Sequence, residues 1–277
     1  MSAARSPRES ATVLLLRDGA GGLEVFMVRR RLASDFVGGA YVFPGGAVDP
    51  EDALPDLTSR LDGVGAEAWG GLLDLSPERA AAHVVAAVRE TFEEAGVLLA
   101  SSPRGPVAPA EGAERSRWEA VRAGLLGGRL SWRAIVQAEA LTLTADRLAY
   151  FAHWVTPAGA PKRFSTRFFL AETPEGQAPL ADDQEVEAGV WLRPEEALEA
   201  RRSGQMTVIL PTARSLEALL PFRTAAEAMA HARGSRVTTI LPRIVLRDGQ
   251  PVALLPGEPG YDEAAEVPLP AFDPSRM

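Results

Sequence analysis

The chain contains no cysteine, and this absence excludes several kinds of site. Without cysteine there is no disulfide, thiolate nucleophile, zinc–thiolate centre or iron–sulfur cluster. Histidine is nearly as scarce, since the three histidines are His83, His153 and His231, far apart in the sequence. A histidine-rich metal site is therefore not expected. Any metal must be held mainly by Asp and Glu oxygen atoms, which favours Mg²⁺, Mn²⁺ or Ca²⁺.

Basic residues are fewer than acidic residues. The chain has 29 Lys and Arg against 37 Asp and Glu, which gives a formal net charge of −8. An acidic surface repels phosphate backbones, so we expect no nucleic acid polymer as a partner. The only lysine is Lys162, and a GC-rich coding bias explains the excess of arginine as readily as function does. An arginine alone is therefore weak evidence of function here.

Long apolar runs are absent too. The apolar stretches are too short and too interrupted to cross a bilayer, and the polar N-terminus is not followed by the apolar segment of a signal peptide. We therefore expect a cytoplasmic protein with no membrane partner. With 277 residues, of which 46% are hydrophobic, the composition is that of a globular protein.

The hydrophobic pattern predicts a mixed α/β domain. Apolar segments between turn residues predict strands at 11–18, 23–30, 148–155, 164–171 and 186–192. Helices are predicted at 65–74, 77–95, 114–126, 131–139, 194–202, 212–220 and 224–232, with a C-terminal hairpin at 237–255 and an acidic loop at 47–64. The helix at 77–95 is the most clearly marked, because Ser76 can cap it, Pro77 suits its first turn and Gly96 suits its end.

Three glutamates share one face near the end of this helix. Glu90, Glu93 and Glu94 are spaced i, i+3 and i+4, which stacks their carboxylates. Like charges at this spacing repel each other, and the C-terminal end of a helix disfavours anions. A divalent cation would reverse the sign of both effects, although a solvated acidic face is the commoner explanation of such a cluster. Arg89, next to the cluster, can pair with a carboxylate and orient it.

A glycine turn upstream favours the metal-binding interpretation. A short apolar run ends at Phe43-Pro44, and Gly45 and Gly46 follow it. Glycines in such a turn allow the backbone to approach a phosphate or a metal closely.

Together, the turn and the acidic helix resemble the Nudix hydrolases, whose box reads G-x5-E-x7-R-E-U-x-E-E-x-G-U, with U a bulky aliphatic residue. The second half of the box is matched by Arg89, Glu90, Glu93, Glu94, Gly96 and Val97, with Thr91 in place of the aliphatic residue. Gly46 and Asp52 match the first half, with Asp in place of Glu.

The box is interrupted in this chain. Residues 53–88, 36 in number, separate Asp52 from Arg89 where the box has seven, and a loop can absorb the extra length. This interruption resembles the branch of the superfamily that contains the peroxisomal coenzyme A diphosphatase. The resemblance covers most of residues 10–261 and includes stretches at 154–157, 163–169 and 254–261.

The resemblance implies a fold and an organisation. It implies an α/β/α sandwich of the Nudix type with a mixed sheet, helical insertions and a C-terminal hairpin. We expect residues 1–277 to form a single domain, with insertions at about 53–76 and 102–140. The insertions could serve to form a homodimer or to cap the site.

The resemblance also implies site residues. The metal, Mg²⁺ or Mn²⁺, would be bound by Glu90, Glu93 and Glu94, and the catalytic set would be Glu93, Glu94, Arg89 and Glu185. Glu185 lies in the acidic run 182–187, for which a solvated loop is an equal alternative. The substrate-binding set would be Gly45, Gly46, Arg163 and Arg167, and a surface role for the two arginines stays open.

The implied activity is hydrolysis of a diphosphate linkage in a small nucleotide. Coenzyme A or acyl-CoA is the leading substrate, with 3′,5′-ADP and (acyl)phosphopantetheine as products. The alternatives are the same chemistry on NADH, ADP-ribose or dinucleoside polyphosphates, and a non-catalytic Nudix fold that binds a nucleotide as a sensor.

Overall fold

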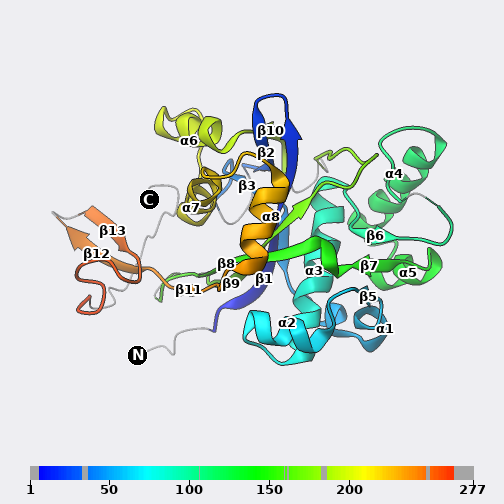
Figure 1. Cartoon of the computed structure of the whole chain (residues 1–277), viewed down its shortest axis with the longest axis horizontal. Helices are drawn as coiled ribbons and strands as arrows, with labels where there is room; N and C mark the ends of the chain where they lie inside the picture. Colours follow the sequence, from blue (N-terminus) through cyan, green and yellow to red (C-terminus); the bar gives the residue numbers. More distant parts are fainter. Residues whose placement is uncertain are drawn as a thin grey trace.

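A mixed sheet of eight strands forms the centre of the molecule (Figure 1). The computed structural model describes residues 6–32, 37–105, 107–158, 160, 162–181, 186–247 and 250–264. The strand order is β10-β2-β1-β9-β8-β11, with β3 paired to β2 and β4 paired to β1. The strands span β1 Arg8–Gly19, β2 Gly22–Arg30, β3 Tyr41–Val42, β4 Gly45–Ala47, β8 Leu148–Val155, β9 Phe164–Glu172, β10 Val186–Leu192 and β11 Thr239–Ile240. The central pair, β1 and β9, is parallel, whereas β1–β2 and β8–β9 are antiparallel.

Helices cover both faces of this sheet, because each strand alternates its apolar side chains between two cores. Val13 and Leu15 of β1 pack in one core with helices α2 and α3, whereas Leu14 and Leu16 pack in the other with α7 and α8. The helices span α2 Ala66–Leu73, α3 Pro77–Ala95, α6 Pro194–Arg202, α7 Leu210–Leu219 and α8 Ala225–Gly234. The expected α/β/α sandwich with a mixed sheet is therefore confirmed.

Helix α3 matches its predicted bounds at both ends. The Ser76 hydroxyl accepts a hydrogen bond from the Arg79 amide, and Gly96 adopts the left-handed conformation with a φ of 67°. These two signals fix the length of the helix. They also place its last two turns, which carry the glutamates, next to β4.

Two segments form small additional structures beside α3. Residues 47–64, predicted as a loop, contain η1 Pro50–Ala53, α1 Pro55–Thr58 and β5 Leu61–Asp62, each too short to leave a periodic pattern. The second segment contains β6 Ala100–Ser101, α4 Ala113–Leu126, α5 Trp132–Ala138, β7 Thr142–Thr144 and η2 Ala145–Arg147. Strands β5, β7 and β6 join the two segments in a three-stranded sheet.

The C-terminal hairpin forms as expected. Strands β12 Arg243–Arg247 and β13 Gln250–Leu254 pair antiparallel and lie beside the main body (Figure 1, orange). Residues 248 and 249, between the two strands, lie outside the described residues. Among the helices that the structure describes, none combines the length and the apolar character needed to cross a membrane.

Candidate active site

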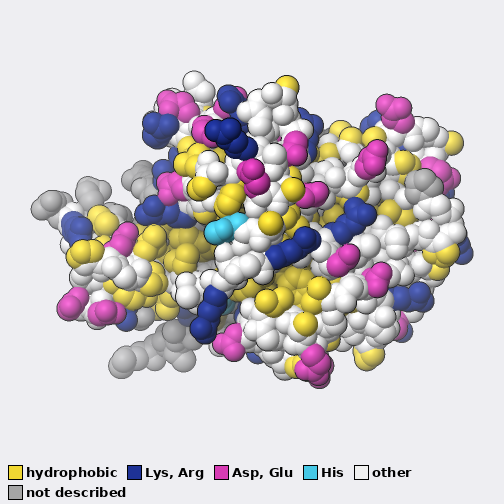
Figure 2. Space-filling model, viewed as in Figure 1, with side chains coloured by type: hydrophobic (Ala, Val, Ile, Leu, Met, Phe, Trp, Pro, Cys, Tyr) yellow, Lys and Arg dark blue, Asp and Glu magenta, His cyan; other side chains and the backbone are white. Residues whose placement is uncertain are grey.

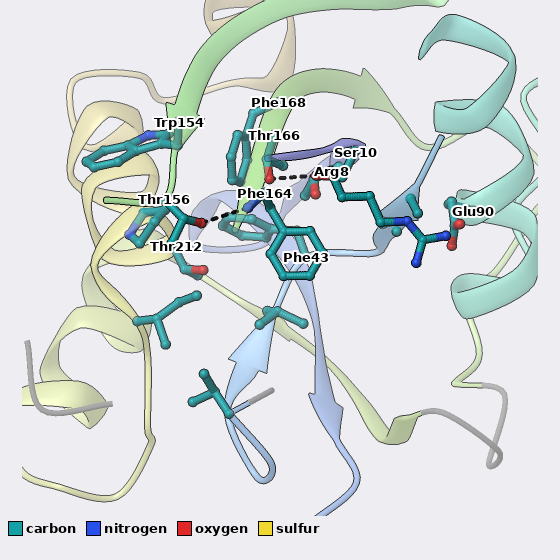
Figure 3. Close-up of a pocket in the computed structure, with 18 of the residues that line it drawn as sticks. Arg8, Ser10, Phe43, Glu90, Trp154, Thr156, Phe164, Thr166, Phe168 and Thr212 are labelled. Atoms are coloured by element: carbon teal, nitrogen blue, oxygen red, sulfur yellow. Dashed lines mark hydrogen bonds between the residues drawn. The ribbon is translucent and has the colours of Figure 1, made fainter. Parts of the chain in front are cut away.

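A cavity of about 510 Å³ opens where β4 and the end of α3 face the start of α7 (Figure 3). The carboxylates of Glu90, Glu93 and Glu94 line it, together with both predicted turn glycines, Gly45 and Gly46. Aromatic side chains form a second part of its wall, namely Phe43, Trp154, Phe164 and Phe168. Residues Ile209, Leu210, Pro211 and Thr212 line it from the beginning of α7. The structure thus brings the expected metal ligands into a hollow of ligand size.

Arg89 is the centre of the acidic end of the cavity. Its guanidinium binds Asp52 in a bidentate manner, with Nε–Oδ1 and Nη2–Oδ2 distances of 2.9 Å each. Its Nη1 donates to Glu90 at 2.8 Å and to Glu93 at 3.3 Å, and Nη2 donates to the Ala47 carbonyl at 2.9 Å. Arg89 therefore orients the acidic side chains, as the sequence suggested.

The ion pair between Arg89 and Asp52 is almost completely buried. Arg89 is 6% exposed and Asp52 is 1% exposed. Burial by itself would lower the pKa of Arg89, but the Asp52 hydrogen bond and the charges of Glu90 and Glu93 together raise it above its ordinary value. The guanidinium therefore stays charged throughout the accessible pH range. A charge so deeply buried is stable only because several carboxylates surround it.

The interrupted box is reassembled in space. Asp52 lies in η1, where its Oδ2 also accepts a hydrogen bond from the Asp49 amide at 2.8 Å. The chain leaves the site after η1 and returns to it through α3, so the 36 intervening residues do not separate Asp52 from Arg89. Asp52 thus occupies the position at which the box that this chain resembles has glutamate.

The glycine turn packs directly against the glutamates. The Gly45 amide donates to Glu94 Oε2 at 2.9 Å. A Cβ atom on Gly46 would lie 2.5 Å from Glu90 Oε1, and a Cβ atom on Gly45 would lie 2.5 Å from the Ala11 carbonyl oxygen. At Gly45 a side chain would clash with the backbone of β1, whereas at Gly46 it would displace the Glu90 carboxylate, so the turn packs closely against both β1 and the acidic face.

The donor set fits a hard divalent cation. Glu90, Glu93 and Glu94 supply only oxygen atoms, and the cradle at Gly46 leaves room for the carboxylate of Glu90. In the described part of the chain, no three Asp, Glu or His side chains are already arranged around a common point. Arg89 instead holds two of the glutamates by hydrogen bonds. A metal ion would draw the same oxygen atoms toward itself.

Arg167 does not reach the cavity, contrary to the sequence-based expectation. Its neighbours in β9, Thr166 and Phe168, line the cavity, so strand alternation turns Arg167 to the opposite face. There it is 5% exposed, donates to the Leu73 carbonyl at 3.2 Å and lies 3.3 Å from Nε2 of His83. We therefore remove Arg167 from the expected substrate-binding set.

Arg163 and Glu185 are the other two predicted site residues outside the Nudix box, and their outcomes differ. Arg163 does not line the cavity, but its Nε donates to the Thr156 carbonyl at 3.1 Å, and Thr156 does line it. Arg163 thus supports the wall rather than facing a substrate. Glu185 lies outside the described residues, immediately before β10. Its assignment as a base or a ligand stays a prediction.

Sequence reasoning missed several residues of the cavity wall. Arg30, Thr156 and Thr212 line the cavity but come from three distant segments without a recognisable motif. Trp154 also lines the cavity, whereas Trp191 packs on Phe26 with a ring-centroid distance of 5.3 Å.

Charged side chains of both signs cover the face shown in Figure 2. Several Lys and Arg side chains lie along a diagonal across the middle of this face, with Asp and Glu side chains beside them.

Comparison with known proteins identifies similar chains. The family model of the NUDT19 Nudix domain matches residues 3–218. The human protein named acyl-coenzyme A diphosphatase NUDT19 is 28% identical over 96% of this chain and 80% of its own length. The chicken protein of the same name is 28% identical over 74% of this chain and 65% of its own length.

A solved structure is also similar. The NUDIX hydrolase from Alicyclobacillus acidocaldarius is 31% identical, with a TM-score of 0.68, over 81% of this chain and 96% of that chain. The similarity therefore includes both the sequence and the arrangement of the sheet and its helices.

Proposed function

Since this chain belongs to the NUDT19 Nudix domain family of the Nudix hydrolases, we propose that it hydrolyses the diphosphate linkage of coenzyme A or acyl-CoA. The products are 3′,5′-ADP and phosphopantetheine or its acyl form. The observation that carries the proposal is the single cavity in which Glu90, Glu93 and Glu94 meet an aromatic wall. The name of the human relative supports coenzyme A as the substrate.

Nudix hydrolases generally use divalent metal ions, and we assign Mg²⁺ or Mn²⁺ to this chain. Glu90, Glu93 and Glu94 would hold the ion. When bound, such an ion neutralises diphosphate oxygens and lowers the pKa of a coordinated water molecule.

The remaining chemistry belongs to side chains and backbone. Glu93 is the least buried of the three glutamates and has the best access to a substrate. Glu94 is tied to the Gly45 amide, which fixes the turn against the helix. We propose that Gly45 and Gly46 allow the backbone to approach a diphosphate oxygen, and that Glu185 accepts the proton of the attacking water.

Arg89 acts as a positioning residue. Its guanidinium contacts the carboxylates and the Ala47 carbonyl. It aligns Glu90 and Glu93 before a metal ion binds, which reduces the rearrangement that binding requires.

The proposal is tested by activity on a panel of compounds. The purified protein is incubated with Mg²⁺ or Mn²⁺ and with CoA, an acyl-CoA, NADH, ADP-ribose or diadenosine tetraphosphate, and the products are separated by chromatography. We expect 3′,5′-ADP from the two CoA compounds. Fast cleavage of NADH without cleavage of CoA would overturn the assignment of the substrate.

A matched pair of variants tests the assignment of the site. Glu93→Gln should lower kcat by about a hundredfold to a thousandfold, because it removes one negative ligand. Glu199→Gln is the control, since Glu199 is 63% exposed in α6 and pairs only with Arg202 in the described structure. Full activity of Glu93→Gln together with insensitivity to a chelator would favour a nucleotide sensor instead.

We also propose three features of the organisation and location of this protein. They are a single domain with insertions at 53–76 and 102–140, a homodimer formed or a site capped through these insertions, and a cytoplasmic location. The described helices α2, α4 and α5 lie in these insertions.

A further inference from the structure

Thr212 is a buried polar residue whose hydroxyl faces the cavity. It is 3% exposed, lines the cavity and lies next to Thr156 in Figure 3. Among the described residues, no protein group forms a hydrogen bond with this hydroxyl, and the oxygen is not among the side-chain atoms that are sealed from solvent. The residue is therefore buried while its hydroxyl stays accessible from the cavity. A ligand that fills the cavity can bond to this hydroxyl in place of water.

The same residue lies in the first turn of α7. This helix has ten residues, begins at Leu210 and has the apolar Ile209 as its N-cap, which provides no side-chain acceptor. The first intrahelical hydrogen bond runs from the Ala213 amide to the Ile209 carbonyl. Among the described backbone contacts, the Thr212 amide has no acceptor, as is usual for an amide in the first turn of a helix, so it is available to a ligand at this end of α7. The N-terminus of a helix attracts anions through such amides and its dipole.

This donor pair lies across the cavity from the glutamates. In Figure 3, Glu90 lies on one side, Thr212 and Trp154 lie on the other, and Phe43 and Phe164 lie between them. The cationic side chain of Arg30 also lines the cavity. The cavity therefore has an end suited to a metal-bound diphosphate, an aromatic middle and a second end suited to an anion.

We infer that Thr212 and the N-terminus of α7 form a second anion subsite, which binds a phosphomonoester carried by the nucleotide substrate in addition to its diphosphate. The inference rests on the proposed function and sharpens it. Coenzyme A has this second phosphate on its ribose, whereas dephospho-CoA, NADH and ADP-ribose do not. The subsite thus selects among substrates that share the same reacting group.

Product binding tests the subsite without relying on turnover. Titration calorimetry in the presence of Mg²⁺ compares adenosine 3′,5′-bisphosphate with AMP on the wild-type protein. We expect the bisphosphate to bind about tenfold more tightly, which corresponds to about 1.4 kcal/mol. Equal affinities for the two nucleotides would overturn the inference even if CoA is hydrolysed.

The variant test uses the isosteric change Thr212→Val, with Thr212→Ser as its matched control because serine keeps the hydroxyl. For Thr212→Val, kcat/KM for CoA should fall about tenfold more than kcat/KM for dephospho-CoA, mainly through KM. Thr212→Ser should keep the preference for CoA. An equal fall for both substrates would overturn the subsite, whereas a wild-type protein that cleaves neither compound would overturn the proposed function alone.

Discussion

Arg89 and Arg167 are both buried arginines, but their surroundings differ in charge. Arg89 contacts the carboxylates of Asp52, Glu90 and Glu93. Arg167 contacts His83 and the Leu73 carbonyl, and its Nε has no hydrogen-bond partner within the described structure. One arginine is therefore compensated by negative charge, and the other is held mainly by neutral groups.

The difference is visible in the pKa values around each arginine. The carboxylates raise the pKa of Arg89 above its ordinary value despite burial, whereas burial lowers the pKa of Arg167. Burial, and then the charge of Arg167, also lower the pKa of His153, which falls to about 4. Carboxylates thus surround Arg89, whereas the charge of Arg167 opposes protonation of His153. The carboxylates around Arg89 also provide the oxygen donors that a divalent cation would need.

Removal of Arg89 should give the largest effect on this contrast. Arg89→Met leaves the buried carboxylate of Asp52 without its partner, so we expect the free energy of unfolding to fall by about 3–5 kcal/mol. Urea denaturation measures this change. The control is Arg214→Met, because Arg214 is 44% exposed, and its pair with Glu217 should contribute less than about 1 kcal/mol. Equal losses of unfolding free energy in the two variants would show that the buried pair stabilises the protein no more than the exposed pair does.

A fall in pH should lower the stability of the folded protein through His153, which lies beside Arg167. The pKa of His153 is about 4 in the folded protein and about 6.5 when unfolded. Between these values the unfolded chain binds a proton that the folded chain does not, so stability is complete above pH 6.5 and falls toward pH 4. We expect His153 to account for about 2 kcal/mol of this loss.

The measurement compares urea denaturation at pH 7 and pH 4.5. His153→Gln should be less sensitive to acid than the wild type, whereas His231→Gln should behave like the wild type because His231 lies exposed on α8. Glu9, Arg79 and His83 also face this region. An unchanged acid sensitivity of His153→Gln would assign the loss to His83, whose pKa is also lowered by burial.

Gly46→Ala in the glycine turn is a smaller and more local change beside Arg89 and its carboxylates. The methyl group of Gly46→Ala would meet the Glu90 carboxylate at 2.5 Å and push it away from its place beside Arg89. We expect kcat for CoA to fall about tenfold. Since the clash is with the far end of a side chain, the free energy of unfolding should change by less than about 1 kcal/mol.

Gly71→Ala is the matched control for this change, because a Cβ atom on Gly71 meets no atom within 4 Å. Steady-state kinetics and urea denaturation on both variants separate a local effect from a global one. A large loss of stability in Gly46→Ala would contradict the local explanation.

The surroundings of Arg89 were predicted from the sequence better than those of Arg167, for a physical reason. The end signals Ser76 and Gly96 are local, so the bounds of α3 could be predicted, and the i, i+3, i+4 spacing of its glutamates is local too. The resemblance placed Asp52 and Arg89 in the two halves of one motif, but their pairing was not predicted, because 36 residues separate them. Strand alternation requires Arg167 and Phe168 to lie on opposite faces of β9, but a single sequence does not tell which of the two faces a ligand.

Thr212 could not be predicted at all. Its position depends on how α7 packs against a sheet formed by strands that are distant in the sequence. A threonine in the first turn of a helix has many roles, and only the cavity shows that its hydroxyl faces an open space. The part of a site that depends on packing between distant segments has no signature in a single sequence.

Replacement of Arg167 should give the smallest effect and the sharpest test of the contrast. Arg167→Met keeps the apolar length of the side chain and removes a charge that no carboxylate contacts within the described structure. A buried charge replaced by an apolar side chain of similar volume is often neutral or stabilising. We therefore expect a change of less than about 1 kcal/mol in the free energy of unfolding, measured in urea at pH 7. The same variant should raise the pKa of His153 from about 4, measured by NMR titration, because the charge of Arg167 lowers it. A loss as large as that of Arg89→Met would mean that neutral partners stabilise a buried guanidinium as well as carboxylates do.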